Sequence, residues 1–200
     1  MWHFFIKGGL VMIPLGFCSI LAMAIVIERI IFYSLQNKND EREFNLLKLY
    51  LHQGKLVEAK DLATSWRSPM GRISGEVLTQ SELDRNLLEQ SAQRAGEAEL
   101  KGMQRGLGLL DTIVTASPLL GLFGTVTGII QAFTAMASTG GNQAAQLSDG
   151  IAKALYTTAF GLAIAIPALF FVNYFYSIVD RKARELTAMG QEILTILRKG

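Results

Sequence analysis

The stretch Ala116-Ser-Pro-Leu-Leu-Gly-Leu-Phe-Gly-Thr-Val-Thr-Gly-Ile-Ile-Gln-Ala-Phe133 decides the fold of this 200-residue chain. It is apolar enough to lie in a lipid bilayer, yet glycines and threonines recur along it. A helix that served only as an anchor would use Leu, Ile and Val throughout. Small residues let helices approach closely, and hydroxyl groups at membrane depth need hydrogen-bond partners. The stretch therefore predicts a membrane helix that packs tightly against other helices and holds polar atoms inside the bilayer.

The distribution of charge predicts three transmembrane helices. Half of the residues are hydrophobic, and the mean hydropathy of +0.30 is high for a soluble domain. Charged residues are absent from residues 10–27, 113–148 and 154–179. Each stretch can include a span of roughly 20 residues, and the middle one also contains a turn at Ser138–Asn142. The expected fold is an all-α membrane protein with helices over 9–33, 107–137 and 151–179.

The rest of the chain is predicted to be helical and cytoplasmic. The expected organisation is an N-terminus with the first span (1–33), a cytoplasmic helical domain (34–105), a transmembrane hairpin (106–180) and a C-terminal helix (181–200). Apolar residues at helical spacing predict short amphipathic helices over 40–53 and 55–66, separated by Gly54, and another over 180–197. Residues 84–105 are expected to continue without a break into the second span, giving a helix of about 55 residues and roughly 80 Å.

The positions of Lys and Arg predict the orientation in the membrane. Basic residues accumulate on the cytoplasmic side. Arg29 and the charged 34–105 segment follow the first span, and Arg181, Lys182 and Arg184 follow the third, whereas residues 138–150 contain no Lys or Arg. We expect a periplasmic N-terminus and a cytoplasmic C-terminus in a bacterial inner membrane. Because 34–105 carries equal numbers of basic and acidic residues, a nucleic-acid surface is not expected.

Two stripes of small residues, each with one threonine, lie on the predicted hairpin. Positions at i, i+4 and i+7 share one helix face. The turn position places Thr125 and Thr158 at similar depth on the two helices. One interpretation is simple helix packing, and the other is that the stripes line a central space once several copies assemble. The first stripe is Pro118, Gly121, Thr125, Gly128 and Ala132, and the second is Ala154, Thr158, Gly161, Ala165 and Ala168; Pro167 also frees a backbone carbonyl.

The predicted hairpin contains hydroxyl groups but has no Asp, Glu, His, Lys or Arg in residues 113–148 or 154–179 that could carry a proton. Asp111 is expected near the inner boundary of the hairpin, and Asp149 and Lys153 near its outer mouth. A proton path through hydrocarbon normally needs a titratable group near its middle. If this chain conducts protons, we therefore infer that a carboxylate on a partner's helix completes the path, beside Thr125 and Thr158. No enzyme activity, metal or cofactor is expected, because His3 and His52 lack companion ligands and no phosphate-binding loop is present.

Three segments of the chain resemble the MotA/TolQ/ExbB proton-channel family. The three spans and the short outer N-terminus resemble its ExbB and TolQ branch. The segments are Phe5-Ile-Lys-Gly-Gly-Leu-Val-Met-Ile-Pro14 leading to Ile27-Glu-Arg29, Ser117-Pro-Leu-Leu-Gly-Leu-Phe-Gly-Thr-Val-Thr-Gly128, and Gly150-Ile-Ala-Lys-Ala-Leu-Tyr-Thr-Thr-Ala-Phe-Gly-Leu-Ala-Ile-Ala-Ile-Pro167 with Asn173.

The resemblance implies a homopentamer around the transmembrane helices of an ExbD- or TolR-like dimer, which supplies the membrane aspartate. Proton flow would then deliver work to a TonB- or TolA-like protein. Thr125 and Thr158 fall on the family's pore threonines, and the chain departs from the family at Lys153, where glutamate is frequent. The expected function is thus an ExbB-type motor subunit that energises TonB-dependent transport across the outer membrane. A TolQ-like role in envelope maintenance and a non-conducting membrane scaffold remain as alternatives.

Overall fold

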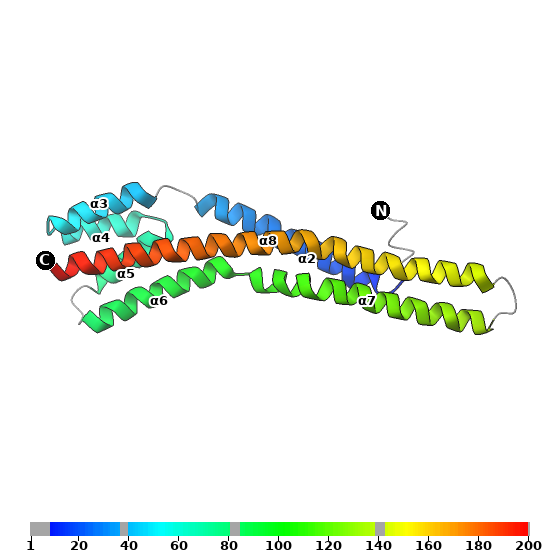
Figure 1. The fold of residues 1–200 in the computed structure, drawn as a ribbon. Helices are drawn as coiled ribbons and strands as arrows, with labels where there is room; N and C mark the ends of the chain where they lie inside the picture. Colours follow the sequence, from blue (N-terminus) through cyan, green and yellow to red (C-terminus); the bar gives the residue numbers. More distant parts are fainter. Residues whose placement is uncertain (1–8, 37–39, 81–84, 139–142, 200) are drawn as a thin grey trace. The chain divides into compact units, whose positions relative to one another are not determined.

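The computed structural model describes residues 9–36, 40–80, 85–138 and 143–199, and all regular structure within these ranges is helical (Figure 1). Three helices, α2, α7 and α8, are long and apolar enough to cross a membrane. The prediction of an all-α membrane protein with three transmembrane helices is therefore confirmed. The helices are α2 (Met12–Gln36), α3 (Asp40–His52), α4 (Leu56–Ser65), α5 (Pro69–Thr79), α6 (Arg85–Gln104), α7 (Leu107–Ser138) and α8 (Gln143–Lys199).

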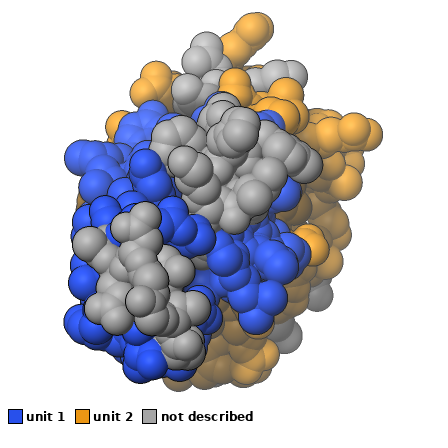
Figure 2. Space-filling model, turned by 90° about the vertical axis from the view of Figure 1, so that its right-hand side faces the viewer, with its two compact units in different colours: residues 1–30, 106–175 blue, residues 31–105, 176–200 orange. Residues whose placement is uncertain are grey.

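The chain divides into two compact units (Figure 2). Unit 1 comprises residues 1–30 and 106–175, and unit 2 comprises residues 31–105 and 176–200. Unit 1 therefore holds most of α2, all of α7 and the first part of α8. Unit 2 holds α3 to α6 and the last part of α8.

Unit 1 is built from helices whose outward faces are strongly apolar. Exposed hydrophobic side chains occur on every one of its helices, for example Phe17 on α2, Leu119 on α7 and Phe170 on α8. In water such a surface would drive association, but lipid tails or other apolar helices can cover it. Arg29, near the end of the apolar part of α2, is buried and pairs with the neighbouring Glu28.

Unit 2 has a hydrophobic core of its own, made from the faces that helical periodicity predicts. The buried positions on α3 are Phe44, Leu47 and Leu51, spaced as expected for one face of a helix. They share one cluster with Leu186 and Ile193 from the end of α8. The amphipathic helices predicted over 40–53, 55–66 and 180–197 are thus confirmed.

One helix of unit 2 was not predicted. Ser68 and Pro69 follow the helix predicted over 55–66, and they begin α5. The Ser68 hydroxyl accepts a hydrogen bond from the Gly71 N–H at 3.2 Å, and Pro69 occupies the first helical turn. A serine cap followed by proline is a helix-start signal as well as a stop signal, so the same two residues serve both purposes.

The long helix expected over residues 84–137 is wrong. The chain breaks at Arg105 and Gly106, between α6 and α7, and Gly106 has a left-handed φ of +79°. Glycine adopts that conformation without steric cost and commonly ends helices. The uninterrupted helix is instead α8, in which the predicted third span and the predicted C-terminal helix form one element of 57 residues.

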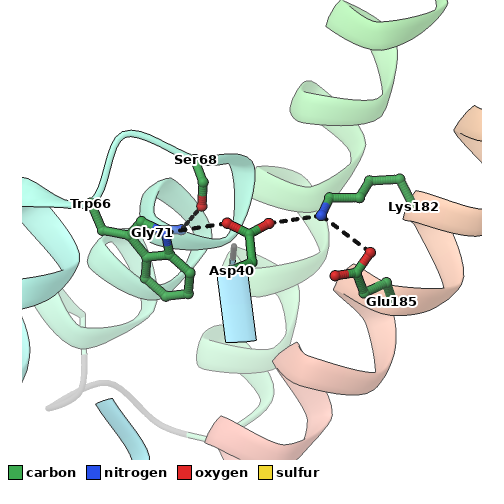
Figure 3. A network of polar contacts seen from close by, with 6 residues as sticks. All are labelled: Asp40, Trp66, Ser68, Gly71, Lys182 and Glu185. Atoms are coloured by element: carbon green, nitrogen blue, oxygen red, sulfur yellow. Dashed lines mark hydrogen bonds and ion pairs between the residues drawn. The ribbon is translucent and has the colours of Figure 1, made fainter. Parts of the chain in front are cut away.

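A buried carboxylate links three parts of unit 2 (Figure 3). Asp40, at the start of α3, accepts a hydrogen bond from the Trp66 indole N–H at 3.2 Å and lies 2.7 Å from the Lys182 ammonium on α8. Lys182 also contacts Glu185 at 3.1 Å. The Asp40 side chain is buried with both oxygens partnered, as a buried charge requires. Nearer the surface, hydrogen bonds to Glu99 raise the pKa of Arg72 and outweigh its partial desolvation.

Candidate functional site

The two stripes of small residues face each other where α7 and α8 pack together. A β-carbon added at Gly121 would lie 2.8 Å from the backbone oxygen of Thr157, and one at Gly128 would lie 3.0 Å from Cβ of Ala154. A β-carbon at Gly161 would overlap the carbonyl of Ser117. Contacts this short leave no room for side chains, so glycine is what allows the two backbones to approach. The helices pack as an antiparallel pair.

Three threonine hydroxyls gather at this contact. The Thr125 and Thr158 hydroxyls hydrogen-bond to each other across the two helices, so the prediction that they lie at matched depth is confirmed. Both also approach backbone carbonyls of the opposite helix: Thr125 Oγ1 lies 3.0 Å from the Ala154 oxygen, and Thr158 Oγ1 lies 3.1 Å from the Gly121 oxygen. The pair is only partly buried, so one side of it remains accessible from outside the hairpin.

A third hydroxyl, that of Thr157, belongs to the same cluster and was not predicted. Thr157 is 1% exposed, and its Oγ1 lies 2.7 Å from the Ala154 oxygen and 3.1 Å from the Gly121 oxygen. The stripe derived from i, i+4 and i+7 spacing passed through Thr158 and omitted its neighbour. The signal that could have found it is the i+3 spacing from Ala154, which also lies on that face.

The other predicted residues occupy varied positions. Ala154, Ala165 and Ala168 are buried, Pro118 is half-buried, and Pro167 is exposed. Asp149 and Lys153 form an ion pair of 2.6 Å one turn apart on α8, and both are largely exposed. Asp111 is exposed near the start of α7. The roles predicted for these residues in lining a pore or its mouths stay predictions.

The site is polar but contains no group that titrates near neutral pH. Residues 113–137 of α7 and 154–179 of α8 include no Asp, Glu, His, Lys or Arg. Hydroxyl groups can donate and accept hydrogen bonds without carrying charge. The cluster can therefore solvate a carboxyl group or pass a hydrogen bond along, but it needs an acid or base from elsewhere to bind and release a proton.

Ser117, one turn before Gly121, is a further buried hydroxyl that the stripe omitted. It is fully buried, and its Oγ lacks a hydrogen-bond partner in the described part of the chain. The adjoining Pro118 carries no N–H, so the backbone oxygen one turn earlier also loses its usual helical donor. Within the described residues, the hairpin thus contains an unsatisfied hydroxyl one turn from Gly121.

Comparisons with known proteins match the whole region around this site. The model of the MotA/TolQ/ExbB proton channel family matches residues 65–188. An ExbB-like biopolymer transport protein of Synechocystis (ExbB-like 3) is 34% identical over 197 residues, which cover 96% of this chain and 92% of that protein. The biopolymer transport protein ExbB of Salmonella typhimurium is 32% identical over 200 residues, covering 93% of this chain and 80% of its own length.

Proposed function

The chain belongs to the MotA/TolQ/ExbB proton channel family, and from that premise we propose that it is the channel-forming subunit of an ExbB-type motor driven by the proton-motive force. Together with an ExbD-like partner it energises TonB-dependent transport across the outer membrane. The observation that carries this proposal is the partly buried Thr125–Thr158 hydroxyl pair, which lies in apolar stretches of α7 (113–137) and α8 (154–179) that contain no acid of their own.

The absence of an acid explains why a partner is needed. A carboxylate that enters a membrane must be neutralised or given hydrogen-bond donors. The Thr125–Thr158 pair offers donors and acceptors to a carboxyl group on a neighbouring helix in either of its protonation states. In this proposal the ExbD-like dimer brings the carboxyl group, and this chain supplies the polar surface along which it is protonated and deprotonated.

The proposed setting is a homopentamer in the bacterial inner membrane. Five copies would surround the helices of the partner dimer, and the assembly would deliver work to a TonB-like protein. The N-terminus would be periplasmic and the C-terminus cytoplasmic, because Arg181, Lys182 and Arg184 follow the apolar part of α8. The exposed apolar faces of α2, α7 and α8 would contact lipid and neighbouring subunits.

Proton flux through reconstituted vesicles tests the proposal. The chain and its ExbD-like partner are reconstituted together, and flux is followed with a pH-sensitive dye under an imposed gradient. Thr158→Val is expected to abolish flux and TonB-dependent uptake while leaving the complex assembled, because valine keeps the shape and removes the hydroxyl. Thr127→Val is the matched control, since among the described residues the Thr127 hydroxyl donates only to carbonyls of its own helix, at Phe123 and Gly124.

Other roles predict other results. A scaffold without ion flow would give wild-type flux equal to that of empty vesicles and would tolerate Thr158→Val. A TolQ-like subunit would conduct protons but would support envelope integrity in place of uptake, and its gene would lie beside TolA- and TolB-like genes. The ExbB names of the relatives from Synechocystis and Salmonella favour the uptake role.

A further inference from the structure

The hydroxyl cluster has more donors than its backbone carbonyls can accept. Each carbonyl oxygen has two lone pairs, and inside a helix one of them accepts the N–H four residues later. The oxygens of Gly121 and Ala154 therefore have one free lone pair each. Three hydroxyl groups can donate to these two lone pairs. They belong to Thr125, Thr157 and Thr158, and each Oγ1 lies within hydrogen-bonding distance of the Gly121 oxygen, the Ala154 oxygen or both.

Thr157 differs from the other two because it is enclosed. Its side chain is 1% exposed, whereas those of Thr125 and Thr158 are only partly buried. It fills space left by a glycine, since a β-carbon added at Gly124 would lie 2.5 Å from Thr157 Oγ1 and 2.7 Å from its Cβ. The Thr157 hydroxyl therefore cannot donate to a group outside the hairpin. Whichever way the three hydroxyl protons point, Thr157 occupies the free lone pair of either Gly121 or Ala154.

The number of free carbonyl lone pairs limits how the hydroxyls of Thr125 and Thr158 can be hydrogen-bonded. With Thr157 in place, one carbonyl position remains for Thr125 and Thr158 together. One of their two protons bonds to that carbonyl, and the other lies on the Thr125–Thr158 hydrogen bond or points outside. Without the Thr157 hydroxyl both carbonyls are open. Thr125 can then donate to Ala154, at 3.0 Å, while Thr158 donates to Gly121, at 3.1 Å, and both protons are held by the backbone.

We propose that Thr157 is a positioning residue that keeps one hydroxyl proton of the Thr125–Thr158 pair off the backbone, where it can bond to a carboxylate on a partner helix. This inference rests on the proposed function. When the partner acid is protonated, this hydroxyl proton turns back and forms the hydrogen bond between the two threonines. The protonated acid then donates its own proton to a threonine oxygen. The pair can thus bind both forms of the acid without leaving a hydroxyl proton unbonded.

The test measures the pH dependence of proton flux in vesicles that contain the full chain and its ExbD-like partner. Thr157→Val removes the hydroxyl and retains the shape, and Thr157→Ser restores the hydroxyl. Loss of a donor to the ionised carboxylate raises the pKa of that acid. The pH of half-maximal flux is expected to rise by about 0.3 to 1 unit in Thr157→Val, a two- to tenfold change as for one hydrogen bond. Thr157→Ser should return it to the wild-type value.

Each outcome decides the inference. A wild-type midpoint in an assembled Thr157→Val complex would overturn it, as would a Thr157→Ser midpoint equal to that of the valine variant, because Thr157 would then act only through its shape. If Thr157→Val does not assemble, the smaller Thr157→Ala lacks the same hydroxyl and is compared with Thr157→Ser in its place. Absence of flux from the wild-type complex would sink the proposed function itself and this inference with it, and the wild-type measurement separates that failure from the others.

Discussion

At the scale of single residues, the close packing of the hairpin depends on its glycines, because glycine has no side chain. Gly121 approaches the backbone of Thr157 and Thr158 so closely that even one methyl group would meet atoms that cannot move aside. The same close approach brings the three hydroxyl groups within reach of carbonyls on the opposite helix. Helix packing and the polar site are therefore one arrangement, and the two interpretations of the stripes are not exclusive.

Gly121→Ala is expected to destabilise the α7–α8 pair. The added β-carbon would lie 2.8 Å from the Thr157 oxygen and 2.9 Å from the Thr158 Cα, and such overpacking typically costs about 1–3 kcal/mol. Thermal unfolding in detergent, followed by circular dichroism, measures the change. Gly108→Ala is the control on the same helix, since a β-carbon there has no neighbour within 4 Å. Equal unfolding temperatures for the two variants would contradict the packing argument.

At the scale of helices, the boundary between α6 and α7 is set by one residue. Gly106 has a φ of +79°, and its N–H and carbonyl lie between the end of one helix and the start of the next, where Leu110 N–H donates to the Gly106 oxygen at 3.0 Å. Sequence patterns favoured a continuous helix because residues 84–137 contain no interruption except single glycines and Pro118. Several single glycines occur in this stretch, and one such glycine is only a weak signal that a helix ends.

Gly106→Ala is expected to cost about 1 kcal/mol or more of stability, because L-residues are strained in the left-handed conformation. Space does not decide this effect, since the nearest atom to the added β-carbon, Ile25 Cγ2, would lie at 3.5 Å. Gly102→Ala, inside α6 with an open position for a β-carbon, should instead be neutral or stabilising by roughly 0.5–1 kcal/mol. Chemical denaturation of both variants gives the comparison. A Gly106→Ala protein as stable as Gly102→Ala would mean that the chain can run on as a single helix.

At the scale of the whole molecule, unit 2 is held together by contacts between segments that lie far apart in the sequence. Two ion pairs connect α3 with the end of α8, one between Asp40 and Lys182 and the other between Lys48 and Glu192. They join the same two helices but differ in burial. Asp40 is 4% exposed by its side chain, whereas Glu192 is 48% exposed. Burial sets the contribution of an ion pair, because water screens exposed charges and does not reach buried ones.

Asp40→Asn should therefore destabilise unit 2 more than Glu192→Gln does. The first change leaves the Lys182 ammonium with Glu185 alone and weakens the acceptor for Trp66, at an expected cost of about 1–3 kcal/mol. The second is expected to cost less than about 1 kcal/mol. Urea unfolding followed by tryptophan fluorescence, with Lys182→Met, Lys48→Met and the double variant of each pair included, yields the coupling energy of each pair. Comparable coupling energies for the two pairs would contradict the argument from burial.

The sequence determined the class of this protein and the approximate course of its helices. Charge-free stretches and helical periodicity are local properties, so they placed the three membrane helices, the α3 face at Phe44 and Leu47, and the matched depth of Thr125 and Thr158. Family motifs in the predicted hairpin then indicated the MotA/TolQ/ExbB proton channel family, which the comparisons confirm. The start of α5 and the break at Gly106 were missed because one local signal, a proline or a glycine, has two possible meanings.

Only the tertiary structure decided which polar atoms meet. A helix turns by about 100° per residue, so the rotation of α8 decides whether Thr157 joins Thr158 at the contact or points away from it. Thr157 and the shared carbonyls of Gly121 and Ala154 lie together only because the small faces of α7 and α8 fix the distance and rotation of the two helices. Hydropathy records how apolar a helix is, but hydrogen bonds depend on positions accurate to a fraction of an ångström, and packing alone sets those.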